Sequence, residues 1–532
     1  MKRPLVLFVI GILAVAVGAL AFRLPRLALR PMHGDEANQA VKAGILFETG
    51  AYRYDPREHH GPSLYYLTLP SWWLGSGRTF AETDEFTYRI VPVLFGVALV
   101  LLLLPVSDGI GRAAAVVAGA LTAISPAMVF YARYYVQETL LVFFTFAAIA
   151  CGWRYVRTKS VGWAVAAGAA VGLMHATKET WVLAAAAMVA GLVLTVLWAR
   201  WRDGEPMAAS AALRPGAIAA GAAAAILAAA ILYSSFGSNL RGPLDSILAY
   251  TAYWTKAGED GLHVHPWWFY LQILIADRPC RGFFWTEGLI VGLALVGSVA
   301  ALRRSALPAE HRPLARFLVF YTVILTVLYA AIPYKTPWCM LSFLHGLILL
   351  AGVGAVALVR WLPRAPLKAA ACVVLAAAAV HLGWQAYLLN YRFYADARNP
   401  HNYAHPTKDI LNLAARMEQL AQAAPEGHDM MVHVVTAENY WPLPWYLRRF
   451  NQDHVGYWHD ADAWWEDVKG LPPPAVVILS QDVQVAVDDK LKGAYNRQSM
   501  YGLRPGVVLN VYARESLWEA MLAGLTSGGG PP

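Results

Sequence analysis

The chain has 532 residues, of which 58% are hydrophobic and only 15% are charged. Soluble domains usually carry about 25% charged residues, so this composition excludes an ordinary soluble globular protein. The net charge of +8 could suggest a nucleic-acid partner, but the basic residues are spread between apolar runs, and we expect no nucleic acid.

The apolar residues fall in runs of about 20 residues, the length that crosses the hydrocarbon core of a bilayer. We predict about eleven transmembrane helices by this criterion. The predicted spans are residues 4–22, 88–106, 113–130, 139–157, 161–177, 181–199, 215–236, 286–302, 317–333, 338–359 and 369–390.

Lys and Arg mark alternate gaps between these spans, which indicates a cytoplasmic N-terminus. An odd number of spans then places everything after residue 390 outside the cytoplasm. We therefore expect a multi-pass protein of the cell (inner or plasma) membrane, in contact with the lipid bilayer. Its fold class is an α-helical polytopic domain, residues 1–390, with outer loops 23–87 and 237–285. Alternatively the first run is a signal peptide cleaved after Ala19-Leu20-Ala21, although it exceeds the usual apolar core of about 7–15 residues.

Residues 391–532 are richer in charge, and we predict that they form a small extracytoplasmic α/β domain. Thr407 could cap a helix that continues to about residue 422. Residues 431–435, 475–479 and 507–511 are short β-branched runs typical of strands. A last helix is expected near 516–522. Cys280 and Cys339 could pair on the oxidising side, but we expect unpaired thiols.

The first outer loop begins with His33-Gly34-Asp35-Glu36, close to a membrane boundary. A carboxylate there is costly to desolvate and could serve as a general base, whereas the alternative is a solvated acidic loop. His33, Asp35, His59 and His60 could bind a divalent metal, but their spacing matches no standard zinc motif and we expect no certain cofactor. Residues 63–74, which include Tyr65, are rich in aromatic side chains and predict an interfacial helix.

Three further segments lie at outer ends of spans and combine a cation with acidic or aromatic neighbours. Lys178 and Lys335 are disfavoured there unless they bind a phosphate or pair with a nearby acid. Arg133 could orient an anionic headgroup, or simply snorkel to the interface. The candidate substrate-binding residues are His33, His60, Tyr65, Arg133, Tyr134, Gln137, Glu138, Lys178, Glu179, Lys335 and Trp338.

A carboxylate base beside a basic phosphate clamp suits glycosyl transfer from a polyprenyl-phosphate sugar to an extracytoplasmic acceptor. We predict that Asp35, Glu36, Arg133, Glu138, Lys178 and Lys335 surround one cavity. An ion-coupled transporter fits poorly, because the ionisable residues lie at the ends of spans and not at their centres.

The sequence resembles the GT-C glycosyltransferases, within them the protein O-mannosyltransferase and lipid A aminoarabinose-transferase branch, and more narrowly the prokaryotic flippase activity-associated family. The resemblance implies Asp35 as the base that activates the acceptor, with Glu36 beside it, and Arg133, Lys178 and Lys335 near the donor phosphate. It leaves open a glycan, lipid or protein acceptor, and a non-catalytic role as an accessory or translocation protein for lipid-linked glycans. The segments that carry it are residues 33–37, 52–56, 60–66, 133–138, 177–180, 334–338 and 441–446.

Overall fold

The computed structural model describes residues 3–56, 60–75, 77–204, 214–256, 263–491 and 495–527. The chain folds into two compact units, and each is built from several chain segments. The helical unit comprises Met1–Leu27, Thr49–Ser71 and Phe86–Tyr403. The sheet unit comprises Ala28–Glu48, Trp72–Glu85 and Ala404–Pro532. The predicted domain boundary at residue 390 stays a prediction.

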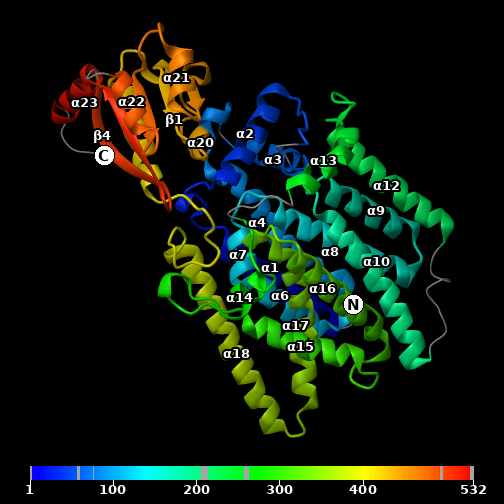
Figure 1. Cartoon of the computed structure of the whole chain (residues 1–532). Coiled ribbons are helices and arrows are strands. Elements are labelled where there is room, and N and C mark those ends of the chain that lie inside the picture. The colour runs from blue at the N-terminus through cyan, green and yellow to red at the C-terminus, as the bar shows by residue number, and fades with distance from the viewer. Residues whose placement is uncertain are drawn as a thin grey trace. The chain divides into compact units, whose positions relative to one another are not determined.

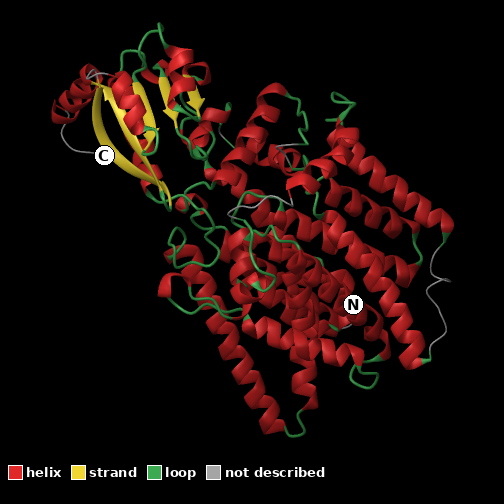
Figure 2. Cartoon of the chain, in the orientation of Figure 1, coloured by secondary structure: helices red, strands yellow, loops and turns green. Residues whose placement is uncertain are grey.

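The helical unit contains almost no strand, as Figure 2 shows. Its helices are α1 (Arg3–Arg23), α3 (Ser63–Leu74), α4 (Glu85–Leu101), α5 (Leu103–Ile110), α6 (Arg112–Ile124), α7 (Pro126–Tyr131), α8 (Glu138–Thr158), α9 (Val161–His175), α10 (Trp181–Trp198), α12 (Pro215–Tyr233), α13 (Gly242–Lys256), α14 (Phe269–Ile275), α15 (Gly288–Leu302), α16 (Arg312–Ala331), α17 (Leu341–Trp361) and α18 (Ala365–Tyr387). Helix α3 has the predicted bounds, and its interfacial position stays a prediction.

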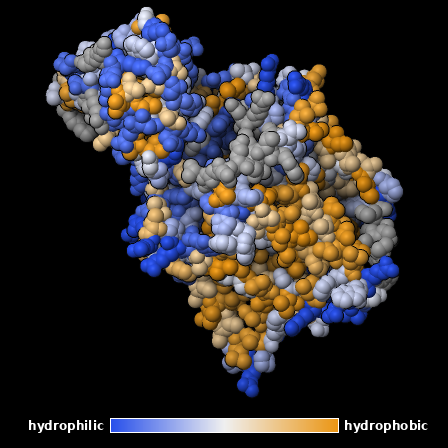
Figure 3. Space-filling view, in the orientation of Figure 1, coloured by the Kyte–Doolittle hydropathy of each residue, from blue (hydrophilic) through white to orange (hydrophobic). Residues whose placement is uncertain are grey.

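Eight helical segments in the described part of the chain are long and apolar enough to cross a membrane. Three shorter apolar helices, α6, α9 and α15, fall on further predicted spans. The protein is therefore a multi-pass membrane protein, and the exact number of crossings stays a prediction. Apolar side chains cover much of the visible surface of this unit (Figure 3). On α18, Val373 and Val380 are 69% and 74% exposed, as expected of side chains that face lipid.

Glycines allow the closest helix contacts in the helical unit. Helix α9 lies beside α12 (Figure 1), and a Cβ at Gly168 would lie 1.9 Å from the carbonyl oxygen of Gly221. Helices α15 and α17 meet in the same way, because a Cβ at Gly297 would lie 2.0 Å from the carbonyl oxygen of Leu350. Small residues let helix backbones approach in lipid, where packing rather than water exclusion drives association.

The sheet unit is built on one five-stranded sheet in the order β2-β1-β3-β5-β4. Strands β1, β2 and β3 are parallel, and β5 is antiparallel to both β3 and β4. The strands are β1 (Val432–Val435), β2 (Val455–Trp458), β3 (Val476–Ser480), β4 (Tyr495–Arg504) and β5 (Val507–Arg514). The predicted strands correspond to β1, β3 and β5, so the small α/β domain is confirmed.

The sequence prediction missed β2 and β4. Strand β2 has only four residues and includes Gly456, which weakens a strand pattern. Strand β4 lies at the edge of the sheet and is mostly polar, so it lacks the apolar run of a buried strand. Both strands form because the neighbouring strands offer them backbone hydrogen bonds, which local composition does not reveal.

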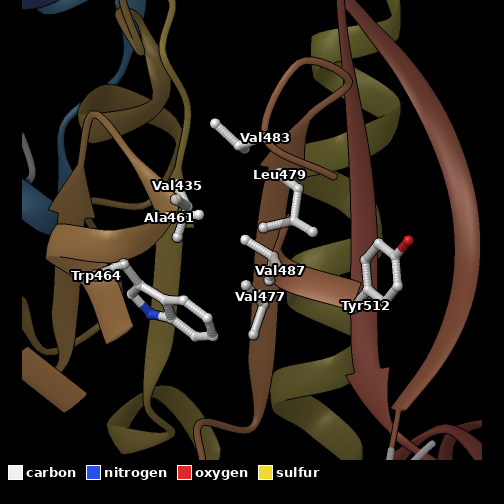
Figure 4. Close-up of a cluster of buried hydrophobic side chains, with 8 residues drawn as sticks. All are labelled: Val435, Ala461, Trp464, Val477, Leu479, Val483, Val487 and Tyr512. Carbon is white, nitrogen blue, oxygen red and sulfur yellow. The ribbon is translucent and has the colours of Figure 1, made fainter. Parts of the chain in front are cut away.

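One face of the sheet is covered by α21 (Ala461–Val468) and α22 (Gln484–Leu491), with α19 (Asp409–Ala423) and α23 (Glu515–Ser527) packed together elsewhere in the unit. Figure 4 shows a cluster of buried hydrophobic side chains between the sheet and helices α21 and α22. Trp464 in this cluster is 1% exposed. The eight buried residues are Val435, Ala461, Trp464, Val477, Leu479, Val483, Val487 and Tyr512. All four cysteines are unpaired.

Two pieces of the first outer loop belong to the sheet unit. They include α2 (Gly34–Thr49), whose Phe47 stacks on Trp72 at 3.8 Å between ring centroids. Trp445 of α20 (Leu443–Tyr446) is fully buried, contacts Phe80 at 5.9 Å and donates to the carboxylate of Glu85 over 3.3 Å. The second piece of the loop is thereby packed on the C-terminal part of the chain, and the end of α2 packs on the residue that begins this piece.

Candidate functional site

Within the predicted outer loop 23–87, Asp35 and Glu36 are in the first turn of a helix, α2, which the sequence did not predict. The imidazole Nδ1 of His33 accepts the backbone N–H of Asp35 over 3.0 Å. In return, the carboxylate of Glu36 accepts the backbone N–H of His33 over 3.2 Å. This reciprocal capping starts the helix, and acidic side chains are favourable at a helix N-terminus. The sequence did not predict this helix cap, because histidine is not a usual N-cap residue.

The two adjacent acids therefore have different environments. Glu36 is fully buried, and its carboxylate also faces the guanidinium of Arg30 at 3.7 Å. The side chain of Asp35 is 51% exposed, and its nearest cation candidate is His33 Nδ1 at 3.9 Å. Because that nitrogen accepts a backbone N–H, it carries no proton and the ring is neutral. The Asp35 carboxylate is thus the accessible one of the pair.

The start of α2 is held by residues from the C-terminal part of the sheet unit. The hydroxyl of Tyr446 accepts the backbone N–H of Met32 over 2.9 Å. The rings of His33 and His405 lie 4.7 Å apart. A Cβ at Gly34 would lie 3.3 Å from the Cβ of Trp441, so Trp441 packs directly on this turn. Asp35 therefore projects from a rigid support.

In the helical unit, the turn between α9 and α10 gathers a second group of candidates around Glu179. The hydroxyl of Tyr54 donates to its carboxylate over 3.2 Å, and His60 Nδ1 lies 2.8 Å from the other oxygen. Burial alone would raise the pKa of Glu179, but His60 and Lys178 reverse that and hold the pKa below its ordinary value. The structure thus brings His60 and Glu179, both predicted substrate-binding residues, into contact. The carboxylate of Glu179 is a buried anion.

Lys178, the neighbour of Glu179, forms a buried ion pair with Glu138 at the start of α8. Burial lowers the pKa of the lysine, but the attraction of Glu138 outweighs it and the pKa is raised overall. Both side chains are less than 10% exposed. The charge of Lys178 is therefore neutralised inside the protein, which was the alternative to phosphate binding.

Lys335 has a contrasting environment. Its ammonium donates to the backbone carbonyl of His265 over 3.0 Å and to that of Ile332, and the residue is 1% exposed. Within the described residues it has no carboxylate partner, and burial lowers its pKa. A buried ammonium group whose partners are neutral carbonyls has no counter-charge, so an anionic ligand would stabilise its charged form.

Aromatic and histidine side chains adjoin this lysine. The hydroxyl oxygen of Tyr403 lies 2.7 Å from His263 Nδ1. The ring centroids of Tyr403 and Trp338 lie 6.0 Å apart. Trp338 in turn lies 5.8 Å from Tyr134, so two predicted residues meet here. Sequence reasoning missed His263, His265 and Tyr403. The His-Val-His pattern in the second outer loop was the available signal.

The guanidinium of Arg133 is engaged at the end of α1, and its contact with an anionic headgroup stays a prediction. Its guanidinium donates to the backbone carbonyls of Arg23, Pro25 and Arg26, the last two over 2.8 and 3.1 Å, and to the hydroxyl of Tyr391 over 3.0 Å. These contacts fix the end of α1, so the structure favours a structural brace over a contact with a headgroup.

The remaining candidates are buried. Tyr65 is fully buried beside Tyr52, with 4.8 Å between ring centroids, and Gln137 is 1% exposed at the N-cap position of α8. Within the described residues there is no group of three or more His, Cys, Asp or Glu side chains that could hold a metal, and His59 lies outside those residues. The single cavity predicted around six residues stays a prediction, because those residues belong to different units.

Comparison with known proteins adds independent findings. The family model described as dolichyl-phosphate-mannose-protein mannosyltransferase matches residues 65–211. No curated protein sequence matches the chain. ArnT from Cupriavidus metallidurans has a similar structure in the apo state, with a TM-score of 0.64, 18% identity, and coverage of 96% of this chain and 98% of that chain. The same protein bound to undecaprenyl phosphate gives a TM-score of 0.63 at 17% identity, with the same coverage of both chains.

A more distant structural similarity extends to an oligosaccharyltransferase. The apo oligosaccharyltransferase from Archaeoglobus fulgidus gives a TM-score of 0.57 at 12% identity, over 84% of this chain and 64% of that chain. At such identities a structural match establishes the fold alone.

Proposed function

The chain has the GT-C fold, and from this premise we propose that it is a membrane glycosyltransferase that moves a sugar from a polyprenyl-phosphate donor to an extracytoplasmic acceptor. The narrower resemblance to the flippase activity-associated family stays a prediction. The accessible carboxylate of Asp35 carries the proposal, because a protein that only bound lipid-linked glycans would need cations more than an acid.

We assign Asp35 as the base because its neighbour is already engaged. Glu36 is buried and caps α2, so its carboxylate accepts a backbone N–H. Asp35 is half-exposed on a rigid helical turn and can accept a proton from an acceptor hydroxyl. A fixed position matters because general-base catalysis requires the carboxylate within hydrogen-bond reach of that hydroxyl.

We assign the donor phosphate to Lys335 rather than to Lys178 or Arg133. Lys178 is neutralised by Glu138. Both terminal nitrogens of the Arg133 guanidinium are occupied in bracing the end of α1, through three backbone carbonyls and the hydroxyl of Tyr391. Lys335 keeps an uncompensated positive charge in a buried position. The binding of undecaprenyl phosphate by the structurally similar ArnT supports a polyprenyl-phosphate donor.

The proposed reaction is a single displacement at the anomeric carbon of the sugar. Asp35 takes the proton of the acceptor hydroxyl while the acceptor oxygen bonds to the anomeric carbon of the sugar. The bond between that carbon and the phosphate oxygen breaks, and the electron pair leaves with the polyprenyl phosphate. Lys335 stabilises the negative charge on the departing phosphate, where electrostatic assistance is most effective. In this scheme the active side and the sheet unit are extracytoplasmic.

The alternative is a non-catalytic accessory or translocation protein for lipid-linked glycans. Purified protein in lipid vesicles would be given a polyprenyl-phosphate sugar and a membrane fraction as the source of acceptor. We expect release of polyprenyl phosphate together with labelled product. Binding of the donor without consumption, or movement of the donor between leaflets without bond cleavage, would favour the alternative.

A further inference from the structure

The carboxyl ends of the parallel strands β1, β2 and β3 form one edge of the sheet. The chain leaves β1 to form β2 on one side and later forms β3 on the other side. Ligands of open α/β sheets bind outside the carboxyl ends of parallel strands where such a reversal occurs. The segment that follows β1 here, residues 436–441, belongs to this edge.

This segment is rigid. The backbone N–H of Thr436 donates to the carbonyl of Trp458 over 2.9 Å, and its hydroxyl accepts the backbone N–H of Glu438 over 3.1 Å. Arg504 donates to the carbonyl of Asn439 over 2.7 Å and to the carboxylate of Glu438 over 3.1 Å. A binding surface whose backbone is already fixed loses little entropy when a ligand binds.

Aromatic rings gather where this segment meets β2. Tyr440 lies 4.7 Å from Tyr457 and 5.5 Å from His459, measured between ring centroids. Tyr457 and His459 are two residues apart, so they share one side of the strand and its extension. His459 is exposed, whereas the hydroxyl of Tyr457 is buried and has no hydrogen-bond partner within the described residues. A buried hydroxyl without a partner is costly unless a ligand or water completes it.

The same rings adjoin the proposed base. Trp441, 6.2 Å from Tyr440 between ring centroids, packs on Gly34, the residue that precedes Asp35 in α2. All of these residues belong to the sheet unit. The aromatic group, defined as Tyr440, Trp441, Tyr457 and His459 and called the edge cluster, is therefore continuous with the turn that presents Asp35.

We propose that the edge cluster binds the acceptor, and that the acceptor is a saccharide. Sugar rings present C–H faces that pack on aromatic rings and hydroxyls that bond to polar groups beside them. A nucleotide is disfavoured, since the segment after β1 has no glycine-rich phosphate loop. The inference rests on the proposed function and names the substrate class that reaches Asp35.

Saccharide binding to the full-length protein tests this inference. The protein would be placed in lipid nanodiscs, which avoid the sugar headgroups of maltoside detergents. The probes are free glucose, galactose, mannose and N-acetylglucosamine, with the α- and β-linked disaccharides of each, detected by saturation-transfer NMR. We expect at least one of these saccharides to bind the wild-type protein. The Kd of that saccharide should rise about tenfold in the Tyr440→Ala variant and in the His459→Ala variant.

Matched variants separate binding from folding. Tyr440→Phe keeps the ring and should bind like the wild type. Trp465→Ala removes an aromatic side chain of the same unit, 36% exposed on α21, and should change nothing. His459 is exposed, so His459→Ala should fold even if Tyr440→Ala does not.

The inference is overturned if no probe binds the wild type, if both cluster variants bind like the wild type, or if the protein glycosylates a peptide with a KM that these variants leave unchanged. Asp35→Asn should retain saccharide binding. If saccharides bind through the edge cluster while Asp35→Asn keeps full transfer activity, the proposed catalytic role fails and the acceptor site stands.

Discussion

Lys178 and Lys335 are both lysines at the ends of apolar helices on the predicted outer side, yet their surroundings differ. The turn after α9 gives Lys178 a carboxylate partner in Glu138, so the pair is neutral. The turn after α16 gives Lys335 only backbone carbonyls, so its charge remains uncompensated within the described residues. A cation at a membrane boundary therefore points to a ligand only when the protein has not already neutralised it.

The same contrast separates Asp35 from Glu36 at the start of α2. Glu36 caps the helix and is buried, whereas Asp35 is half-exposed. In both pairs one residue is part of the scaffold and the other is available for chemistry. Variants of the four residues should therefore divide into losses of stability and losses of activity.

The largest effect is expected for Asp35→Asn. Asparagine keeps the size of aspartate but cannot accept a proton, so transfer should fall by about 10²–10⁴-fold. Donor binding and the melting temperature should barely change. The assay is glycan transfer in membranes supplied with a polyprenyl-phosphate sugar, beside a donor-binding measurement. Full activity would remove Asp35 from the role of base, and full activity in Glu36→Gln as well would favour the non-enzymatic alternative.

Lys178→Ala should destabilise the protein by about 3–5 kcal/mol, because it leaves the buried Glu138 without its cation. The melting temperature would be measured for this variant and for the double variant Lys178→Met/Glu138→Gln. The double variant should recover much of the loss, since it removes both charges. A stable Lys178→Ala that binds the donor poorly would instead make Lys178 the phosphate contact.

Lys335→Ala should weaken donor binding by about ten- to a hundredfold, since a charge-assisted contact to phosphate is lost. It should not destabilise the protein, because removing an uncompensated buried charge also removes its desolvation cost. Titration with a polyprenyl-phosphate sugar and a melting curve give the two values. Unchanged donor affinity would contradict the assignment of Lys335 to the donor phosphate. Lys178 and Lys335 would then no longer differ in function.

Glu36→Gln should cost about 1 kcal/mol of stability, because the amide oxygen keeps the cap on His33 but loses the charge facing Arg30. The loss of transfer activity should be much smaller than in Asp35→Asn. Chemical denaturation and the transfer assay report the two effects. If Glu36→Gln is the more damaging to catalysis, the roles of the two acids are exchanged.

No effect of pH between 6 and 9 is expected on the stability that Lys178 contributes. The folded pKa is raised above the ordinary 10.5, so this contribution is complete below 10.5 and is lost only as the pH rises through the folded value. The difference in melting temperature between wild type and Lys178→Ala should stay constant over this range. A difference that shrinks toward pH 9 would mean that Glu138 does not hold the lysine charged.

The sequence predicted the membrane helices well because a long apolar run has few alternatives in lipid. It also identified Asp35, Glu179 and Lys335 as unusual residues at membrane boundaries. It could not reveal that His60 contacts Glu179, since 119 residues separate them, nor that His33 caps α2. The strands β2 and β4 were missed for a local reason, since β2 is short and contains a glycine and β4 is a mostly polar edge strand.

The sheet unit also has a consequence for the biogenesis of the protein. Residues 28–48 and 72–85 are synthesised before almost all of the helical unit, but partners such as Trp445 and Arg448 follow 360 and 365 residues after the groups that they contact. The two early segments therefore cannot make these contacts until residues 445–448 have been synthesised. A truncated chain would insert its helices yet present an unsupported Asp35, so incomplete products would reach the membrane without a finished active site.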